Sequence, residues 1–577
     1  MFIENWQRMA LIACLSCCFC LGESQQIAPL QVVYDHIGIK GALAVRMNRS
    51  MDRLEESKYQ PDNVFLTEEQ SGGWPGDTEG RTILALALEA QATHRTPAYL
   101  DEIVKRIPGH LNERGYMGPI YKGMANEQQL SGNGWMLRGL CELYAWKKDK
   151  QVLEIIRNMA RNLFLPAIDK FARYPINPEE RRKDIGAESG SIAGLKDGWM
   201  LSTDIGCVFI GMEGLIHAYT LLGDQELIAP IEALIGRFLE MDLTAIKAQT
   251  HATLTACRGL VRYADYSGRK ELVEEAARRF GLYRENGMTE NHENYNWFDR
   301  YDTWTEPCAI VDSYMLAVQL WQHTMDPMYL EEAENIYFNA ICHTQRYNGG
   351  FGCDNCPGIA TGTQELALHC NEAHWCCTMR GGEGLASAAR YTFFTGKRQV
   401  FMPFLRTANL NTAMEGKNIQ LEMVTDYPFG NNVEIQIGNN DVGTVELLLA
   451  APSWTKGHTV SINGKKAKAT RKKGFLAVKG DFRKGDRIAI SFSMETHWKN
   501  TLNKHNTEKT WRKIAFGPLL LGVSGKGNLS IAPDAQFERL DRTTWSVKGT
   551  DVRLKPIYHL MDDRVWTDKD YHKQILF

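Results

Sequence analysis

The feature that most constrains the fold is a helix, a short polar break and a second helix, repeated along residues 80–395. One copy reads GMEGLIHAYTLLGDQELIAPIEALIGRFLEM, and another reads TLTACRGLVRYADYSGRKELVEEAARRFGLY. Apolar residues recur every three or four positions on both sides of each break, which is typical of helices. The spacing of the copies is irregular, so a solenoid of fixed period is not indicated. We therefore expect an α/α toroid, with one helix of each pair facing the centre and a concave ligand site built from loops at one end.

The character of the chain changes after about residue 400. Segments such as NVEIQIG, TVELLLAAPSW and DRIAISFSM alternate or run apolar and are separated by Gly, Asn and Asp turns, which is typical of strands. We expect a helical domain over residues 25–400 and a β-sandwich over residues 401–500. A β-rich C-terminal segment, residues 501–577, contains WRKIAFGPLLLGVSG and is expected to pack on the sandwich. The fold class is thus mainly α with C-terminal β.

The amino terminus has the pattern of a secretory signal. Arg8 precedes the apolar run MALIACLSCCFCLG, and polar residues follow it, so residues 1–24 are predicted to be a signal peptide. We expect an exported protein, periplasmic or at the cell surface. LIAC, which ends at Cys14, resembles a lipoprotein box and leaves a lipid anchor as an alternative. No later run reaches the roughly 18 apolar residues of a membrane-spanning helix, so we expect no transmembrane segment.

Charge argues against a nucleic-acid partner. The net charge is −3, and there is no long basic run of the kind that neutralises phosphates. The most basic stretch, NGKKAKATRKKG, is interpreted as a solvated hairpin. The oligomeric state is left open by the sequence.

The cysteines point to a metal. Four of the fourteen fall in the predicted signal, and seven of the other ten lie between Cys308 and Cys377. The adjacent pair Cys376 and Cys377 would strain a disulfide with each other, but both can ligate one ion. With Glu306 and Cys308 they form a set of three thiolates and one carboxylate that suits zinc. The alternative for any single thiol is a buried neutral side chain.

A second cysteine spacing competes with that set. Cys353-x2-Cys356 is a spacing that commonly binds zinc, and with the adjacent pair at 376 and 377 it would form a different site. A local disulfide between Cys353 and Cys356, or two idle thiols, is the favoured alternative. No role is assigned to Cys370.

Three segments together resemble glycoside hydrolase family 127. They are TEPCAIVDSYMLAVQLWQHTMDPMYLEEAENIYFNAI, the CC pair about seventy residues later and KIAFGPLLLGV. The family contains retaining β-L-arabinofuranosidases and their relatives. The resemblance implies an (α/α)6 barrel followed by β-sandwich domains. It also implies zinc held by Glu306, Cys308, Cys376 and Cys377, with Cys376 as the nucleophile.

The resemblance also implies an acid/base glutamate sixteen residues before the ligand glutamate. Counting back from Glu306 gives Glu290, and Glu293 is its rival. Retaining hydrolysis needs a nucleophile on one face of the anomeric carbon and a proton donor at the leaving oxygen. Zinc ligation deprotonates a thiol, and a buried glutamate with a raised pKa can donate and then accept the proton. A solvated loop carboxylate is the alternative for either glutamate.

The sugar-binding residues depart from the family's pattern. His251 matches a family histidine by its surrounding text, Trp135 stands where another is expected, and a third is not found. CCTMRGG also replaces the family's CCPPN. The sugar is therefore β-L-arabinofuranose or a related pectin sugar such as aceric acid, whose carboxylate Arg300 or Arg380 could bind as a fork. Solvation is the alternative for each arginine.

The segment SGGWPGDTEGRT offers a further sugar contact. Trp74 could stack on a sugar face, and Asp77 and Glu79 could bind hydroxyls, although a turn before a helix would use the same residues structurally. We expect an exported zinc-thiolate exo-glycosidase acting on an oligosaccharide or glycan. The alternatives are a carboxylate-based hydrolase or lyase with structural zinc, and a glycan-binding protein without chemistry, because a toroid hosts many functions.

Overall fold

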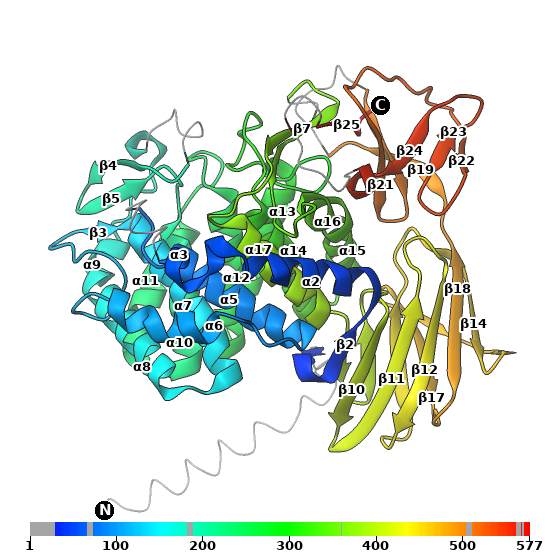
Figure 1. Ribbon diagram of the computed structural model, residues 1–577, viewed down its shortest axis with the longest axis horizontal. Coiled ribbons are helices and arrows are strands. Elements are labelled where there is room, and N and C mark those ends of the chain that lie inside the picture. The colour runs from blue at the N-terminus through cyan, green and yellow to red at the C-terminus, as the bar shows by residue number, and fades with distance from the viewer. Residues whose placement is uncertain are drawn as a thin grey trace, which may run out of the picture.

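The computed structural model describes residues 29–65, 73–181, 189–358, 361–502, 510–560, 567 and 571–577. The predicted signal peptide lies outside the described residues. Figure 1 shows a helical domain beside two β regions, one formed by the strands that follow it and one by the C-terminal segment.

Six inner helices close into a ring in the described part of the chain. Each contacts the next in the order α5, α7, α10, α12, α14, α17, and α17 returns to α5. Six outer helices pack around this ring, each against one or two inner helices, so the (α/α)6 barrel is confirmed. The inner helices are α5 (Asp77–Thr93), α7 (Glu127–Lys147), α10 (Val208–Leu222), α12 (Thr250–Ser267), α14 (Pro307–Thr324) and α17 (Cys377–Arg390). The outer helices are α2 (Gly41–Leu54), α6 (Leu100–Arg106), α8 (Lys150–Met159), α11 (Ile228–Leu239), α13 (Glu271–Asn286) and α15 (Pro327–Ile336).

Burial explains the two kinds of helix. The inner helices are buried on every side, whereas an outer helix such as α8 buries one stripe formed by Val152, Ile156 and Met159. Glycines let inner helices approach closely: a Cβ at Gly134 on α7 would lie 2.6 Å from the Cα of Gly211 on α10. Alanine there would force the two helices apart.

Buried charges link the inner helices below the end of the barrel where these helices begin. Arg138 Nε lies 2.7 Å from Glu213 Oε2, and Arg138 Nη2 lies 2.6 Å from Glu383 Oε1. Asp312 Oδ1 receives Arg258 at 2.5 Å and Arg380 at 2.6 Å. Three positive and three negative side chains therefore balance inside the ring, and they come from α7, α10, α12, α14 and α17: Arg138, Arg258, Arg380, Glu213, Asp312 and Glu383.

The β-sandwich begins earlier in the chain than the sequence indicates. One sheet has the order β1-β8-β9-β13-β17-β16 and the other β15-β14-β18-β12-β11-β10-β2. Two strands from the amino-terminal part, β1 (Leu30–Gln31) and β2 (Ile37–Ile39), belong to it, so the expected boundary at residue 401 is corrected. The other strands are β8 (Phe394–Gly396), β9 (Gln399–Met402), β10 (Ala408–Met414), β11 (Lys417–Thr425), β12 (Asn432–Asn440), β13 (Val445–Ala450), β14 (Lys456–Ile462), β15 (Lys465–Lys466), β16 (Thr470–Lys472), β17 (Phe475–Gly480) and β18 (Arg487–Ser493).

The C-terminal sheet includes a hairpin from the helical domain. Strand β25 (His572–Gln574) pairs with β7 (Glu365–Cys370), which pairs with β6 (Cys353–Asn355). The C-terminal segment therefore packs on the helical domain as well as on the sandwich, where only the sandwich was expected. The other strands of this sheet are β19 (Thr496–Asn500), β20 (Arg512–Phe516), β21 (Leu519–Ser524), β22 (Phe537–Arg539), β23 (Trp545–Val547) and β24 (Arg553–Pro556). A small separate sheet contains β3 (Ala125–Asn126), β4 (Ile192–Lys196) and β5 (Trp199–Ser202).

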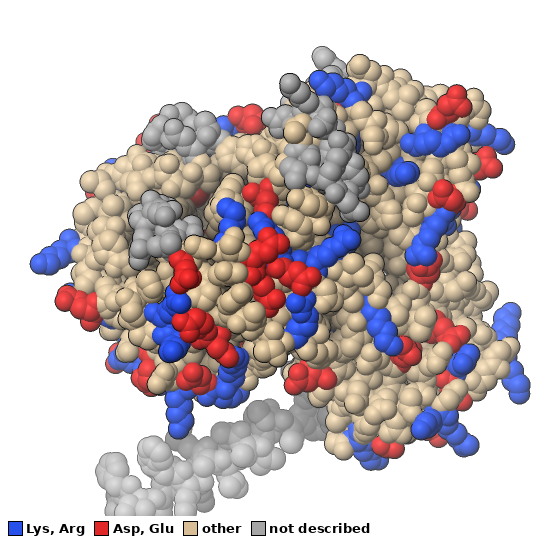
Figure 2. Space-filling model, viewed as in Figure 1, with Lys and Arg blue, Asp and Glu red and all other residues tan. Residues whose placement is uncertain are grey.

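The surface mixes charges of both signs. Figure 2 shows acidic and basic side chains interspersed over the visible face of the molecule, with the two kinds side by side near its centre. Every helix among the described residues is too short or too polar to cross a membrane.

The buried charges generate a stability prediction. Asp312→Asn leaves Arg258 and Arg380 without their shared anion, so we expect the free energy of unfolding to fall by about 3–5 kcal/mol. Asp302→Asn, which removes an exposed partner of Arg300, should cost under about 1 kcal/mol. Urea denaturation followed by circular dichroism measures both, and equal losses would contradict the prediction.

The same pair of arginines makes the contribution of Asp312 to the stability of the fold depend on pH. Although burial opposes it, Arg380 and Arg258 lower the pKa of Asp312 below its ordinary value. The carboxylate therefore stabilises the fold fully above its unfolded-state pKa of about 3.9, and this contribution is lost as the pH falls. The stability difference between the wild type and Asp312→Asn should shrink in that acidic range.

Candidate metal centre and active site

A cavity of about 590 Å³ lies at the end of the barrel where inner helices begin. The first turns of α5, α12 and α17 and the residue before α14 all contribute to its lining. The positive ends of these helix dipoles therefore converge on the cavity and favour anionic groups there. Hairpin β6–β7 forms another part of the wall.

Three thiols lie together at the base of this cavity. Cys377 Sγ lies 3.7 Å from Cys308 Sγ and 3.4 Å from Cys376 Sγ, and all three sulfurs lie within 4.8 Å of one another. Two sulfurs bound at 2.3 Å to one tetrahedral zinc ion are about 3.8 Å apart. The spacing of the three thiols therefore fits a single zinc ion.

Glu306 supplies the carboxylate next to these thiols. Its Oε1 lies 3.2 Å from His251 Nδ1, and His251, Glu306 and Cys308 place ligand atoms within 4.8 Å of one another. Its other oxygen, Oε2, is buried and has no hydrogen-bond partner in the structure. A buried carboxylate oxygen without a partner is costly, and a bound cation would satisfy it. The three thiols thus form one group, and Glu306 places a ligand atom within 4.8 Å of one of them, Cys308. The composition of these four side chains suits zinc, and their role as a ligand set stays a prediction.

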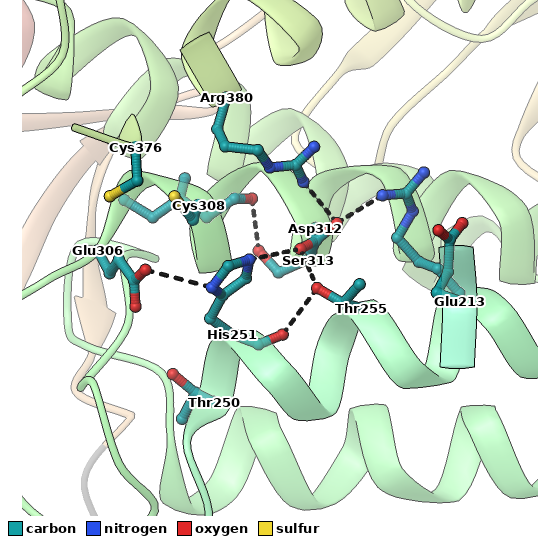
Figure 3. Close-up of polar contacts among 12 residues, drawn as sticks. Glu213, Thr250, His251, Thr255, Glu306, Cys308, Asp312, Ser313, Cys376 and Arg380 are labelled. Atoms are coloured by element: carbon teal, nitrogen blue, oxygen red, sulfur yellow. Dashed lines mark hydrogen bonds and ion pairs between the residues drawn. The ribbon is translucent and has the colours of Figure 1, made fainter. Parts of the chain in front are cut away.

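His251 connects Glu306 to the charged core. Figure 3 shows its ring between Glu306 and Asp312, with Nε2 3.5 Å from Asp312 Oδ2. Although burial lowers it, the negative charge of Glu306 raises the pKa of His251 overall. The imidazole of His251, which lies between Glu306 and Asp312, therefore holds the Glu306 side chain in place from the side of the charged core.

Without a metal, the pKa values of the thiols shift in opposite directions. Although burial opposes it, hydrogen bonds from Cys376 and Cys377 lower the pKa of Cys308, and Arg81, with Nη1 3.4 Å from its sulfur, adds to the effect. The hydrogen bond to Cys308 raises the pKa of Cys376. The environment therefore favours the thiolate of Cys308 over that of Cys376 in the metal-free cluster.

The competing zinc set is not assembled in the structure. Cys353 is the cross-strand partner of Cys370, and both line the cavity. Cys356 points away and donates to Glu293 Oε2 at 3.3 Å. Neither a Cys353–Cys356 disulfide nor a site that joins both to Cys376 is present among the described residues. The x2 spacing is misleading because the two side chains lie on opposite faces of the hairpin.

A further group of potential ligands already has protein cations beside it. Glu293, His343 and Asp354 are buried together. Arg346 lies 2.8 Å from Asp354 Oδ1, and Lys573 Nζ lies 3.1 Å from His343 Nε2. These side chains offset the negative charge, so the thiol group is the stronger candidate for a metal site.

Both predicted acid/base glutamates lie outside the set of described residues that line the cavity. Glu290 Oε2 lies 2.9 Å from Lys513 Nζ and accepts from the backbone N–H of Leu502, so its side chain faces the C-terminal segment. Glu293 is fully buried and lies 2.8 Å from His343 Nδ1. The cavity lining therefore does not support the assignment of Glu290, which stays a prediction, because a proton donor must reach the leaving oxygen.

Three predicted substrate contacts lie elsewhere. Trp135 is fully buried, with the guanidinium groups of Arg81 and Arg380 4.0 and 4.5 Å from its ring centroid. Arg380 is also fully buried and bound to Asp312, so it cannot fork onto a substrate carboxylate. Arg300 binds Asp302 with two hydrogen bonds of 2.9 Å in a loop outside the cavity.

Some of the other residues that the sequence suggested do line the cavity, and three further lining residues were not predicted. Trp74 and Asp77 line the cavity, as does His251, whereas Glu79 does not. Trp304, whose ring stacks on His369 at 4.7 Å, and Trp375, which is 48% exposed, were missed. Their nearness in sequence to Glu306 and Cys376 was an available signal. Asp204 was also missed, and no motif marks it. The substrate-binding roles stay predictions.

Comparisons with known proteins agree with the proposed resemblance. Residues 404–494 match the family model described as beta-L-arabinofuranosidase, GH127 middle domain. No curated protein matches this chain in sequence. The matched range covers most of the sandwich, so the family pattern is detected there.

Solved structures match over the full length. A β-arabinofuranosidase of family GH127 is 14% identical, with a TM-score of 0.68 over 96% of this chain and 98% of that one. A GH127 β-L-arabinofuranosidase from Geobacillus stearothermophilus T6 is 14% identical, with a TM-score of 0.68 over 94% and 99%. A protein described only as a glycoside hydrolase is 13% identical, with a TM-score of 0.68 over 96% and 98%. The chain has the fold of these proteins, and its resemblance to glycoside hydrolase family 127 is confirmed.

The thiol group generates a metal-binding prediction. We expect the purified protein to bind about one zinc ion per chain and Cys377→Ser to bind it at least about tenfold more weakly, because one of the ligands is lost. Cys141→Ser, which changes a buried thiol on α7 outside the group, is the matched control. Competition with a chromophoric chelator measures the affinities, and unchanged zinc affinity in Cys377→Ser would refute the assignment.

The cross-strand thiols generate a second prediction. Opposed residues of an antiparallel pair have Cα atoms about 4.5–5.5 Å apart, within the range of a disulfide. The hydrogen bond from Cys353 also lowers the pKa of Cys370, which favours its thiolate. Oxidised glutathione should therefore join Cys353 to Cys370, as detected by peptide mapping. Cys356→Ser should leave this bond unchanged, and a Cys353–Cys356 product would contradict the prediction.

Proposed function

We propose that the protein is an exported, zinc-dependent retaining exo-glycosidase whose nucleophile is Cys376. The observation that carries this proposal is the group of three thiols, two of which line the cavity together with Glu306, in a chain with the fold of β-L-arabinofuranosidases. Export is proposed from the sequence of residues 1–24, to the periplasm or the cell surface, with a lipid anchor as the alternative.

Accessibility supports Cys376 as the nucleophile. Cys308 is buried and lies outside the cavity lining, and Cys377 lines the cavity but is buried, whereas Cys376 lines the cavity and is partly exposed. A zinc ion held by Glu306 and the three cysteines would keep the thiol of Cys376 ionised at neutral pH. Cys376 is also the residue before the first turn of α17, where the helix dipole stabilises a thiolate. Of the three thiols, it is the most exposed.

The shape of the cavity supports action on a terminal sugar. Its volume of about 590 Å³ suits a small sugar with part of its aglycone, which favours exo action. Trp74, Trp304 and Trp375 offer flat apolar faces against which the C–H groups of a sugar can pack. Asp77 and Gln249 offer polar groups for hydroxyls.

The charges of the cavity favour a neutral sugar. Arg81 is the arginine among its described lining residues, and its Nε already binds Asp77 Oδ2 at 2.7 Å. Arg300 and Arg380, on which the case for a carboxylated sugar depended, are engaged elsewhere. The proposed substrate is therefore a terminal β-L-arabinofuranoside of an oligosaccharide or glycan in preference to aceric acid.

A prediction about Cys376 separates the proposed function from its alternatives. Cys376→Ser should retain at least part of its zinc but lose turnover by more than about 1,000-fold, because the nucleophile of the double displacement is removed. Release of monosaccharide from arabinan- and pectin-derived oligosaccharides measures activity, and metal analysis measures zinc. Cys257→Ser, a buried thiol on α12 outside the cavity, is the control.

The outcomes differ for each alternative. Substantial residual activity in Cys376→Ser would favour a carboxylate-based hydrolase or lyase with structural zinc. Affinity for a glycan without any released product, in the wild type and in the variants alike, would favour a glycan-binding protein.

A further inference from the structure

The proposed reaction requires a proton donor, and both glutamates that the sequence suggested lie outside the cavity lining. The described residues of the lining include three carboxylates: Asp77, Asp204 and Glu306. The donor must reach the oxygen that leaves the sugar held against Cys376. These three side chains are therefore the candidates, and the inference rests on the proposed function.

Two of the three carboxylates have other partners. Asp77 Oδ2 accepts from Arg81 Nε at 2.7 Å, and although burial raises the pKa of Asp77 overall, this guanidinium opposes the rise and holds the carboxylate in an ion pair. Glu306 lies 3.2 Å from His251 Nδ1 and belongs to the proposed ligand set. Neither is placed to give up a proton to a substrate.

Asp204 differs because its hydrogen-bond donors are neutral. It lies between β5 and α10, and its side chain is almost completely buried. Oδ1 accepts from Ser189 Oγ at 2.9 Å, and Oδ2 accepts from the N–H of Gly190 at 3.0 Å. Its own N–H donates to Ser202 Oγ at 3.1 Å, which fixes the backbone. The carboxyl group is thus held at the cavity wall by neutral donors, and none of its hydrogen-bond partners among the described residues is a cation.

The surrounding charges favour the protonated form. Burial and the negative charge of Glu306 raise the pKa of Asp204 to about 7, against the hydrogen bonds from Ser189 and Gly190. Glu127 adds to the increase, and its carboxylate is paired with Arg181 at 3.2 Å. A general acid works best when its pKa lies near the working pH, because it must be protonated in one step and ionised in the next.

We propose that Asp204 is the general acid and base of the reaction. As Cys376 sulfur bonds to the anomeric carbon, the bond to the leaving oxygen breaks, and that oxygen takes the proton of Asp204. Water then attacks the same carbon and displaces the sulfur, and the Asp204 carboxylate takes a proton from the water. Each proton that Asp204 gives is therefore recovered within one turnover.

The test compares leaving groups in Asp204→Asn. Asparagine keeps an oxygen for the Gly190 N–H but has no acidic proton. With an arabinofuranosyl oligosaccharide, whose leaving alcohol needs protonation, kcat/KM should fall by at least about 100-fold. With a 2,4-dinitrophenyl arabinofuranoside, whose leaving group departs unprotonated, the first burst of dinitrophenol should stay within about threefold of the wild type.

Two further measurements separate proton transfer from a purely structural role. Azide should restore turnover of the dinitrophenyl substrate by Asp204→Asn and yield an arabinosyl azide of retained configuration, because azide attacks the sugar on Cys376 without a general base. The wild type should also lose kcat/KM as the pH rises through the pKa of the acid, and the variant should lack this basic limb.

Glu290→Gln is the comparison variant, because it removes the carboxylate that the sequence favoured. Under the proposal, any loss of activity in Glu290→Gln is the same for the oligosaccharide and the dinitrophenyl substrate. The proposal is overturned if Asp204→Asn loses both substrates equally, if it keeps full activity on the oligosaccharide, or if Glu290→Gln shows the dependence instead. A wild type that hydrolyses neither substrate overturns the proposed function, and this inference with it.

Discussion

The common direction of the six inner helices is the constraint on which the site depends. Because each helix pair returns to the same end of the barrel, the inner helices all begin at that end and their partial positive charges converge there. Glu306, Cys308, Cys376 and Cys377 come from two neighbouring inner helices, α14 and α17, that close the ring. The adjacent cysteines thus meet a partner seventy residues away without any special loop.

Electrostatics explain why this arrangement needs its charged core. Burying several thiolates and carboxylates together would cost free energy if no positively charged side chain lay near them. Asp312 holds Arg258 and Arg380 in place and also faces His251, which in turn contacts Glu306. Figure 3 shows this succession of contacts from the charged core to the cavity. The polar interior of the barrel therefore supports the site rather than forming a second one.

Sequence reasoning predicted the parts that depend on periodicity and on adjacent residues. Local patterns indicated the helix pairs, the later strands and the nearness of Cys308 to the adjacent pair Cys376 and Cys377. Local patterns were not enough where the direction of a side chain decides the outcome. Counting residues placed Glu290 on the right loop, but Lys513, more than two hundred residues later, draws it away from the cavity. No sequence motif marks Asp204, because its hydrogen-bond partners can be identified only in the folded wall of the cavity.

The hairpin β6–β7 gives the protein an order of assembly. It carries Cys353 and Cys370 in the cavity wall, yet its outer strand pairs with β25, which is synthesised much later. The helical ring can form on the ribosome before this pairing exists, but the wall beside the thiols cannot be completed until β25 has emerged.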